Sequence, residues 1–310
     1  MDARARPALV ALVLLFAVFA VALHSDGFTS SDNLLNIVRQ TAPVTVMAVA
    51  VVLVLSAGEI DLSLGSVVAL SALVTAKVLR DQDLVVAVAA GLGTGLAIGA
   101  ANGAFVTLLR LPSFLVTLAT MGLVAGLARS ITDLQSVAVA DADFVAVFGT
   151  GDVGPVPGLA LWGLGAVLAG HLVLRHRRFG AHVLATGDDE RAARISGIHV
   201  DRVRFAVLVL SGAAAALAGI LYTGRLQGAT YSLGEQDLLV VLAAVVIGGT
   251  RLYGGEGSVL GALLGSLVMG MLTNGLILWG LNGSQQLIAQ GAVLLVAISV
   301  TMRDPRRGAA

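Results

Sequence analysis

The sequence of 310 residues contains no cysteine, and this absence excludes disulfide frameworks and thiolate metal sites. Aromatic residues make up only 5% of the chain and the net charge is zero, so we expect no nucleic-acid partner. The five histidines form no HExxH pair, and we expect no metal site. Lys77 is the single lysine and follows alanine, so the glycine–lysine step of an ATP-binding loop is missing. We therefore expect the chain to bind no cofactor and to be no enzyme.

Charged residues are also scarce, at 12% against about 25% in soluble domains. Hydrophobic residues make up 57% of the chain, and the mean hydropathy is +0.94. The 38 glycines fit membrane helices, in which small residues let neighbouring backbones approach closely. The composition predicts an all-α, polytopic transmembrane helical bundle, a single transmembrane domain over residues 1–310 without a soluble domain.

Long apolar stretches set the expected number of spans, since a helix needs about 20 apolar residues to cross the hydrocarbon. The two shortest stretches, residues 114–127 and 238–248, are either re-entrant segments or borrow flanking residues to complete a span. The stretch nearest the N-terminus, residues 8–23, does not end in an A-x-A cleavage site, so we expect it to be retained as a signal anchor. Ten stretches qualify or nearly do: residues 8–23, 41–57, 65–79, 84–109, 114–127, 158–174, 205–224, 238–248, 257–278 and 286–302.

The distribution of basic residues predicts the orientation, because connections rich in Arg and Lys stay in the cytoplasm. With ten spans, the cytoplasmic set is Arg4, Arg6, Arg110, Arg175, Arg177, Arg178, Arg191, Arg194, Arg202, Arg204, Arg251, Arg303, Arg306 and Arg307. The outer set is Arg39, Lys77, Arg80, Arg129 and Arg225. Both termini are therefore predicted to be cytoplasmic.

Residues 175–204 form the one substantial polar connection on the predicted inner side. Within it, residues 188–197 (DDERAARISG) predict a short helix, with acids where the N-terminal dipole favours negative charge and Gly197 at the left-handed position after the end. Two turns are not stable alone in water, so this helix must dock on the membrane face or on another protein. The alternative is a solvated loop that only anchors the topology.

Four motifs, in order along most of the chain, resemble those of ABC importer permeases of the ribose, xylose and arabinose type. They are residues 56–65 (SAGEIDLSLG), 102–103 with 110–121 (RLPSFLVTLATM), 187–198 (GDDERAARISGI) and 248–261 (GGTRLYGGEGSVLG). Ser113 departs from the family pattern, where a second proline is common. Glu59, in place of part of a Gly-Gly pair, adds a charge that needs a partner.

The resemblance implies the inner membrane component of a binding-protein-dependent monosaccharide importer. It implies three protein partners, in addition to the lipid bilayer: an ABC ATP-binding subunit, an extracytoplasmic sugar-binding protein and a second permease copy or paralogue that forms a dimer with this chain. ATP would be bound by the partner subunit. The helix that would couple to it consists of Asp188, Asp189, Glu190, Arg191, Ala192, Ala193, Arg194 and Gly197.

Polar side chains inside or next to the spans are candidates for a sugar path, which needs hydroxyl and amide partners. The carboxylates of residues 58–61 either cap the next helix, with Asp61 or Ser63 as the N-cap, or belong to a discontinuous segment along the path. The amides and hydroxyls alternatively bond neighbouring helices. The candidates are Glu59, Asp61, Ser63, Asn102, Thr117, Thr120, Asn274 and Gln286.

Other functions remain open at this point. Within the family, the substrate could be a nucleoside, an autoinducer sugar or a branched-chain amino acid. An ion-coupled secondary transporter would instead use a buried acid, with Glu59, Asp61, Glu235 and Asp237 as candidates. An intramembrane hydrolase is disfavoured because no acid–base constellation emerges.

Overall fold

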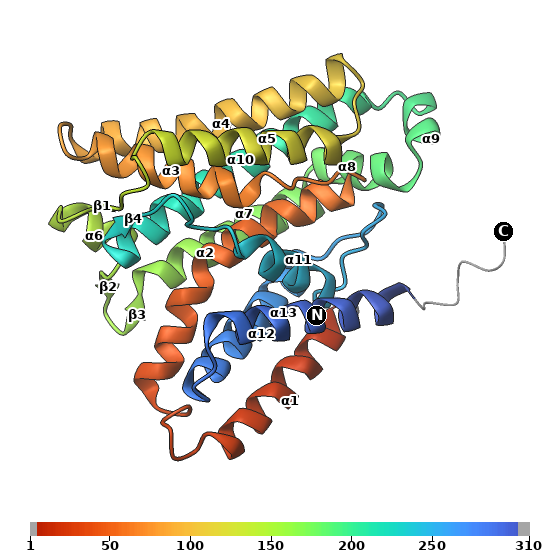
Figure 1. The fold of residues 1–310 in the computed structure, drawn as a ribbon. Helices are drawn as coiled ribbons and strands as arrows, with labels where there is room; N and C mark the ends of the chain where they lie inside the picture. Colours follow the sequence, from red (N-terminus) through yellow and green to blue (C-terminus); the bar gives the residue numbers. More distant parts are fainter. Residues whose placement is uncertain (1–4, 303–310) are drawn as a thin grey trace.

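The computed structural model describes residues 5–302, and these form a helical bundle with only four two-residue strands (Figure 1). The strands pair as β1 (Val137–Ala138) with β4 (Gly228–Ala229) and β2 (Asp152–Val153) with β3 (Val156–Pro157), both antiparallel. The helices are α1 (Arg6–Ala22), α2 (Ser31–Ser56), α3 (Leu64–Val78), α4 (Leu84–Leu108), α5 (Ser113–Ser130), α6 (Ala142–Phe148), α7 (Gly158–His176), α8 (Arg178–Asp188), α9 (Glu190–Ile195), α10 (Val200–Leu226), α11 (Asp237–Ile247), α12 (Val259–Leu278) and α13 (Gly283–Met302).

Within the described residues, six helices are long and apolar enough to cross a membrane: α2, α4, α5, α7, α10 and α12. Four more apolar stretches are shorter: α1, α3, α11 and residues Gly283–Ser299 of α13. The all-α membrane bundle predicted from composition is therefore confirmed. The count of ten spans and the cytoplasmic termini stay predictions, and Arg4, Arg303, Arg306 and Arg307 of the inner set lie outside the described residues.

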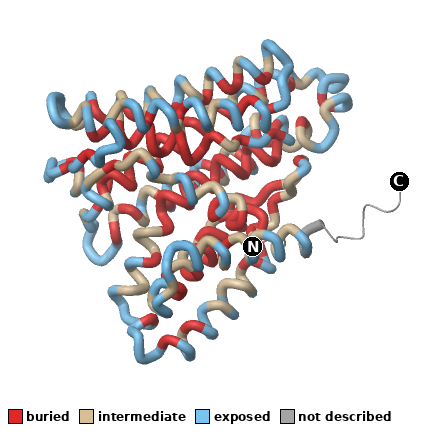
Figure 2. Tube along the Cα trace, viewed as in Figure 1, coloured by how far each residue is buried: buried red, intermediate tan, exposed pale blue. Residues whose placement is uncertain are grey.

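Helix α2 is the centre of the bundle, as the burial pattern in Figure 2 shows. In its most apolar stretch 83% of residues are buried, against 22% in α4 and 28% in α5 and α7, whose apolar side chains face outward. Its start is ten residues earlier than the predicted span, because the polar residues 31–40 are also helical. Ser30 caps this start by accepting a hydrogen bond from Asn33 N at 3.3 Å.

Helices α4 and α10 pack backbone against backbone through glycines. A Cβ on Gly95 would meet the carbonyl oxygen of Gly212, and a Cβ on Gly99 would meet that of Leu208. Small residues at a helix–helix interface allow this approach. Van der Waals contact between the two backbones thus fixes α10 against α4.

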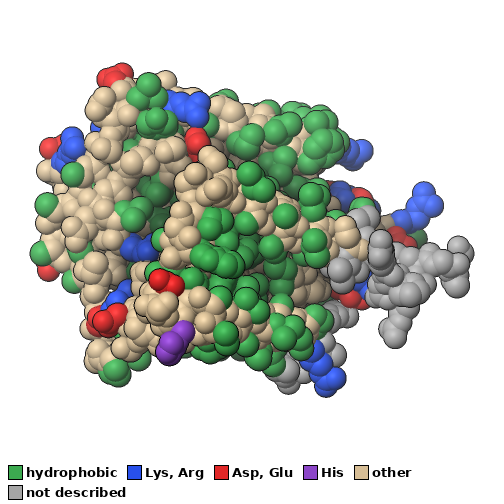
Figure 3. All heavy atoms as spheres, turned by 60° about the horizontal axis from the view of Figure 1, so that its bottom comes forward, with side chains coloured by type: hydrophobic (Ala, Val, Ile, Leu, Met, Phe, Trp, Pro, Cys, Tyr) green, Lys and Arg blue, Asp and Glu red, His purple; other side chains and the backbone are tan. Residues whose placement is uncertain are grey.

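The bundle has two distinct ends. At the α9 end, α2, α4, α7 and α11 stop and α10 begins; at the β1 end, α6 and the two strand pairs cover the helix termini (Figure 1). Seen from the side of α1 in Figure 3, hydrophobic side chains cover the middle of the surface and most charged ones lie toward the ends. This is the arrangement expected of a bundle with an apolar belt.

Helices α3 and α11 are half-length and meet near the middle of the bundle. Each follows a stretch that is not helical, residues 59–63 before α3 and residues 230–236 before α11. Gly65 at the start of α3 touches the backbone of Gly234 closely enough that a Cβ would clash. Non-helical backbone at membrane depth is tolerated where protein or a water-filled cavity surrounds it.

Candidate translocation and coupling site

The short helix predicted in the polar connection is present as α9. The carboxylate of Asp189 accepts a hydrogen bond from Ala192 N at 3.0 Å, Glu190 lies in the first turn, and Gly197 has a φ of 83°. The predicted start of this helix is wrong, because Asp188 is the last residue of α8 and lies outside α9. The sequence prediction missed α8, since its arginine, histidine and glycine residues disguise an amphipathic helix.

One face of α9 is fixed to the bundle and the other is exposed. Ala193 is buried, while Arg191, Ala192 and Ser196 are exposed. Ile195 leaves 82% of its surface uncovered, which is unusual for a large aliphatic side chain in a polar connection. An apolar residue flanked by arginines on an exposed helix is suited to contact another protein.

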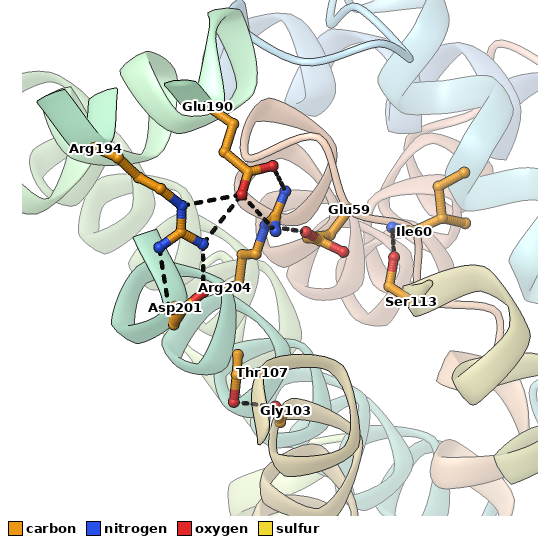
Figure 4. A network of polar contacts seen from close by, with 9 residues as sticks. All are labelled: Glu59, Ile60, Gly103, Thr107, Ser113, Glu190, Arg194, Asp201 and Arg204. Carbon is orange, nitrogen blue, oxygen red and sulfur yellow. Dashed lines mark hydrogen bonds and ion pairs between the residues drawn. The ribbon is translucent and has the colours of Figure 1, made fainter. Parts of the chain in front are cut away.

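Five charged side chains join α9 to two other parts of the chain; we call this set, Glu59, Glu190, Arg194, Asp201 and Arg204, the charged network (Figure 4). Arg204 Nε lies 2.6 Å from Glu59 Oε1, a close ion pair. Its terminal nitrogen donates to Glu190 Oε2 at 2.7 Å. Arg194 donates to Glu190 at 3.0 Å and to Asp201 at 2.6 Å. Arg204 therefore links α9 directly to the segment that follows α2.

The two acids bonded to Arg204 differ in their environments. The Glu59 side chain is only 6% exposed, and burial raises its pKa despite the opposing effects of Ser113 and Arg204. Glu190 is 43% exposed, and although partial burial acts against ionisation, hydrogen bonds from Arg194 and Arg204 lower its pKa. The sequence shows no partner for the charge of Glu59; in the structure Glu59 forms an ion pair with Arg204.

The charged network borders a cavity of about 410 Å³ at the α9 end. Its wall also includes the turn between α4 and α5, with Arg110 and Ser113. Arg110 has a φ of 55°, so this turn is held in a left-handed conformation. The cavity is thus lined by three separate segments that meet at Glu59.

The segment 59–63 is not helical, and α5 holds it by side-chain hydrogen bonds. Ile60 N donates to Ser113 Oγ and Leu62 N donates to Thr117 Oγ1, both at 3.0 Å. The N-cap interpretation is wrong for Ser63, which makes no side-chain bond to α3; its hydroxyl donates to Asp61 at 2.6 Å. The departure from proline at Ser113 supplies a hydrogen-bond acceptor.

Polar side chains, all buried except the half-buried Thr120, continue from this segment into the bundle; Asp61, Ser63, Asn102, Thr117, Thr120 and Ser211 form the polar cluster. Asp61 accepts from Ser211 Oγ at 2.6 Å and from Ser63 N at 2.9 Å. Asn102 donates to Ser63 Oγ at 3.0 Å and accepts from Thr120 Oγ1 at 2.7 Å. Five of the eight candidate path residues therefore lie together, and Glu59 lies beside them.

Asn274 and Gln286 lie elsewhere. Asn274 exchanges hydrogen bonds with Asn33 of α2 at 2.8 and 3.0 Å, which matches the helix-packing alternative. Gln286 lies in the first turn of α13, bordering a separate cavity. Sequence reasoning missed Ser211, which stands alone in an apolar span, and Gln290, whose spacing of four from Gln286 was an available signal.

The glycine-rich segment 248–258 packs beneath the same end of the bundle. Gly255 N donates to Ser56 O at 3.1 Å, and Ser258 caps α12 through Gly261 N at 3.1 Å. At the end of α8, a Cβ on Gly187 would collide with Ser56 O and would lie 2.7 Å from Gly255 N. The end of α2, the end of α8 and this segment are therefore in backbone contact.

No group of three or more potential metal-binding side chains occurs within residues 5–302. The geometry instead offers an exposed helix joined by ion pairs to a buried, non-helical segment. Such an arrangement can pass a displacement of α9 to backbone inside the bundle.

Comparison with known proteins agrees with this arrangement. Residues 33–298 match the family described as the permease component of the branched-chain amino acid transport system. The chain belongs to this permease family. It is 39% identical to the ribose import permease of Escherichia coli (strain K12) over 94% of this chain and 92% of that protein.

Two further relatives cover similar lengths. The ribose import permease of Bacillus subtilis (strain 168) is 37% identical over 93% of this chain and 90% of that protein. The D-allose transport system permease of Escherichia coli (strain K12) is 30% identical over 93% of this chain and 89% of that protein. No solved structure matches the chain.

Proposed function

We propose that this chain is the membrane permease subunit of a bacterial ABC importer that moves a monosaccharide inward across the inner membrane. ATP is hydrolysed on separate subunits, and a binding protein delivers the sugar from outside. The observation that carries the proposal is the link from the exposed helix α9 through Arg204 to Glu59. The relatives named for ribose and allose support a sugar as the substrate, over amino acids or nucleosides.

In this mechanism the ATP-binding subunit docks on α9. Closure of the ATP-binding subunits displaces α9, and the ion pairs of Arg204 transmit that displacement to segment 59–63. Because α5 and α10 hold this segment through Thr117 and Ser211, its movement changes the polar cluster in the core. The proposed result is a switch between outward-facing and inward-facing access.

Reconstitution in proteoliposomes tests this proposal. We expect uptake of labelled D-ribose or D-allose only when the ATP-binding subunit, the binding protein and ATP are all present. Uptake by the chain alone under a sodium or proton gradient would contradict the proposal and support the ion-coupled alternative. Stimulation of ATP hydrolysis by the loaded binding protein provides an independent measurement.

A further inference from the structure

A second cavity, of about 190 Å³, lies away from the charged network, between α2, α10, α11, α12 and α13. Its wall includes four glutamines, a tyrosine, an arginine and an aspartate: Gln40, Gln236, Gln286, Gln290, Tyr222, Arg225 and Asp237. We call it the amide pocket. A polar cavity among predominantly apolar helices is costly unless its groups have partners.

Three of the four glutamines are held in a common manner. Gln40 donates its amide hydrogen to Gly270 O at 2.9 Å, Gln286 to Leu281 O at 2.9 Å, and Gln290 to Thr273 Oγ1 at 3.2 Å. Each NH₂ group is thus anchored on the surrounding helices. The carbonyl oxygen of each side chain is left to accept a further hydrogen bond.

Gln290 gives the independent indication of a ligand. It is 5% exposed, and its Oε1 atom is buried without a hydrogen-bond partner. Leaving a buried acceptor unsatisfied costs free energy, so a donor from water or from a ligand would stabilise it. The residue that provides this oxygen lines the cavity.

The charges of the pocket favour a neutral ligand. Arg225 and Asp237 contribute opposite charges, and both line the cavity together with Tyr222. Amide oxygens accept from hydroxyl groups, while Arg225 and amide nitrogens donate to hydroxyl and ring oxygens. This set matches a polyhydroxylated ring and offers no unbalanced charge to an ion.

The size of the pocket also fits. A water molecule takes about 30 Å³ in the liquid, so the cavity has room for about six waters, a space comparable to one sugar ring. We propose that the amide pocket is a monosaccharide subsite of the permease, in which Gln40, Gln286 and Gln290 accept hydrogen bonds from sugar hydroxyls. This inference rests on the proposed function, and it assigns the substrate a place within that function.

The test measures sugar discrimination in the complete reconstituted transporter. Gln290→Met and Gln40→Met remove the acceptor and keep side-chain length; Gln82→Met, in the exposed turn between α3 and α4, is the matched control. Uptake of D-ribose is compared with uptake of its monodeoxy analogues, each with the same binding protein, so that the selection by that protein cancels between variants.

We expect each pocket variant to lose about 5- to 10-fold of the preference for ribose over one of the analogues, the loss of one hydrogen bond. The control keeps the wild-type preference. A role in helix packing alone would lower uptake of all sugars equally and leave their ratios unchanged. Unchanged ratios in both variants overturn the subsite.

A second measurement needs no transport. The melting temperature of the permease in lipid nanodiscs is followed as D-ribose is added, because a ligand of the folded state stabilises it. Wild type and Gln82→Met should gain stability, and Gln290→Met should gain less. If transport occurs but neither measurement separates the variants, the subsite is wrong and the permease function stands. If ribose stabilises the chain through Gln290 but no ATP-dependent uptake occurs, the subsite stands and the proposed function is wrong.

Discussion

The molecule has two polar regions built on different chemistry, the charged network at the α9 end and the amide pocket between α2, α10, α11, α12 and α13. The charged network consists of three acids and two arginines that join segments distant in sequence. The amide pocket relies mainly on neutral side chains anchored on neighbouring helices. An ion pair is strong but is lost when either charged residue is replaced by a neutral one. Amide side chains, in contrast, can form hydrogen bonds with a neutral ligand. This difference fits the two proposed roles, in which the charged network connects α9 to segment 59–63 and the amide pocket binds the sugar.

Among the changes considered, removal of Arg204 should have the largest effect on the free energy of unfolding and on uptake. Arg204→Met leaves Glu59 buried without its cation, which we expect to cost about 3 kcal/mol of the free energy of unfolding. It also disconnects α9 from segment 59–63, so ATP-dependent uptake should be lost. Denaturant unfolding in detergent and proteoliposome uptake measure the two effects.

Arg202→Met, on an exposed arginine of the same helix turn, is the control and should change the free energy of unfolding little. The double variant Glu59→Gln with Arg204→Met removes the buried unpaired charge and should recover most of the lost stability without recovering uptake. A loss below about 1 kcal/mol for Arg204→Met would show that the ion pair is structurally dispensable.

Asn102 tests the polar cluster, which lies beside the charged network. Asn102→Leu leaves the Thr120 hydroxyl without its acceptor and removes the hydrogen bond to Ser63 Oγ, which keeps its bond to Asp61, so we expect a loss of about 2 kcal/mol in the free energy of unfolding. Thr117→Val should cost less, because Leu62 N alone loses its acceptor at this site. If both also impair uptake, the cluster lines the path; normal uptake kinetics would assign these residues to packing.

The exposed face of α9 provides a smaller and more selective change. Ile195→Glu adds a charge to a side chain that is 82% exposed, so the fold should be unaffected. We expect co-purification of the ATP-binding subunit to fall about 10-fold, the equivalent of about 1.4 kcal/mol. Val153→Glu, 66% exposed at the other end of the molecule, is the matched control.

Gly197→Pro tests the same face through the backbone. Proline cannot adopt the φ of 83° found here, so the exit from α9 must change. Exchanging Glu190 and Arg191 would instead reverse the charge presented to Arg204. Undiminished co-purification of the ATP-binding subunit with both variants would rule out docking at α9.

The sequence predicted much of this arrangement because its strongest signals are local. The apolar stretches, the caps of α9 and the left-handed Gly197 all follow from short-range chemistry. The partner of Glu59 could not be predicted, since Arg204 lies 145 positions away and no spacing rule connects them. The start of α2 was missed because Asn33 and Gln40 look like loop residues until Asn274 and Gly270 supply their partners.

The amide pocket shows the same limit. Gln286 and Gln290 share a helix face, which sequence spacing can show, but their relation to Gln40 depends on how three helices pack. Ser63 was misread as a helix cap because serine is a common N-cap, and in the structure Asp61 competes for its hydroxyl. Tertiary hydrogen bonds override local propensity at the positions closest to the candidate site.

Acid should weaken the charged network slightly and leave the amide pocket unaffected, which is the smallest effect expected. The pKa of Glu190 is below its ordinary value of 4.5, so its contribution to stability is full above that value and is lost as pH falls through the lowered pKa. Glu59 acts in the opposite direction: its pKa is raised, so its charged form costs stability as pH rises through 4.5 toward the raised value. Because Glu190 is 43% exposed, solvent screening keeps its contribution below about 1 kcal/mol.

Melting temperatures measured from pH 7 downward should therefore differ between wild type and Glu190→Gln at neutral pH and converge in acid, while Gln290→Met should run parallel to wild type. No difference at any pH would mean that the ion pairs of Glu190 contribute nothing to stability, and a constant difference would mean that its contribution does not depend on its charge.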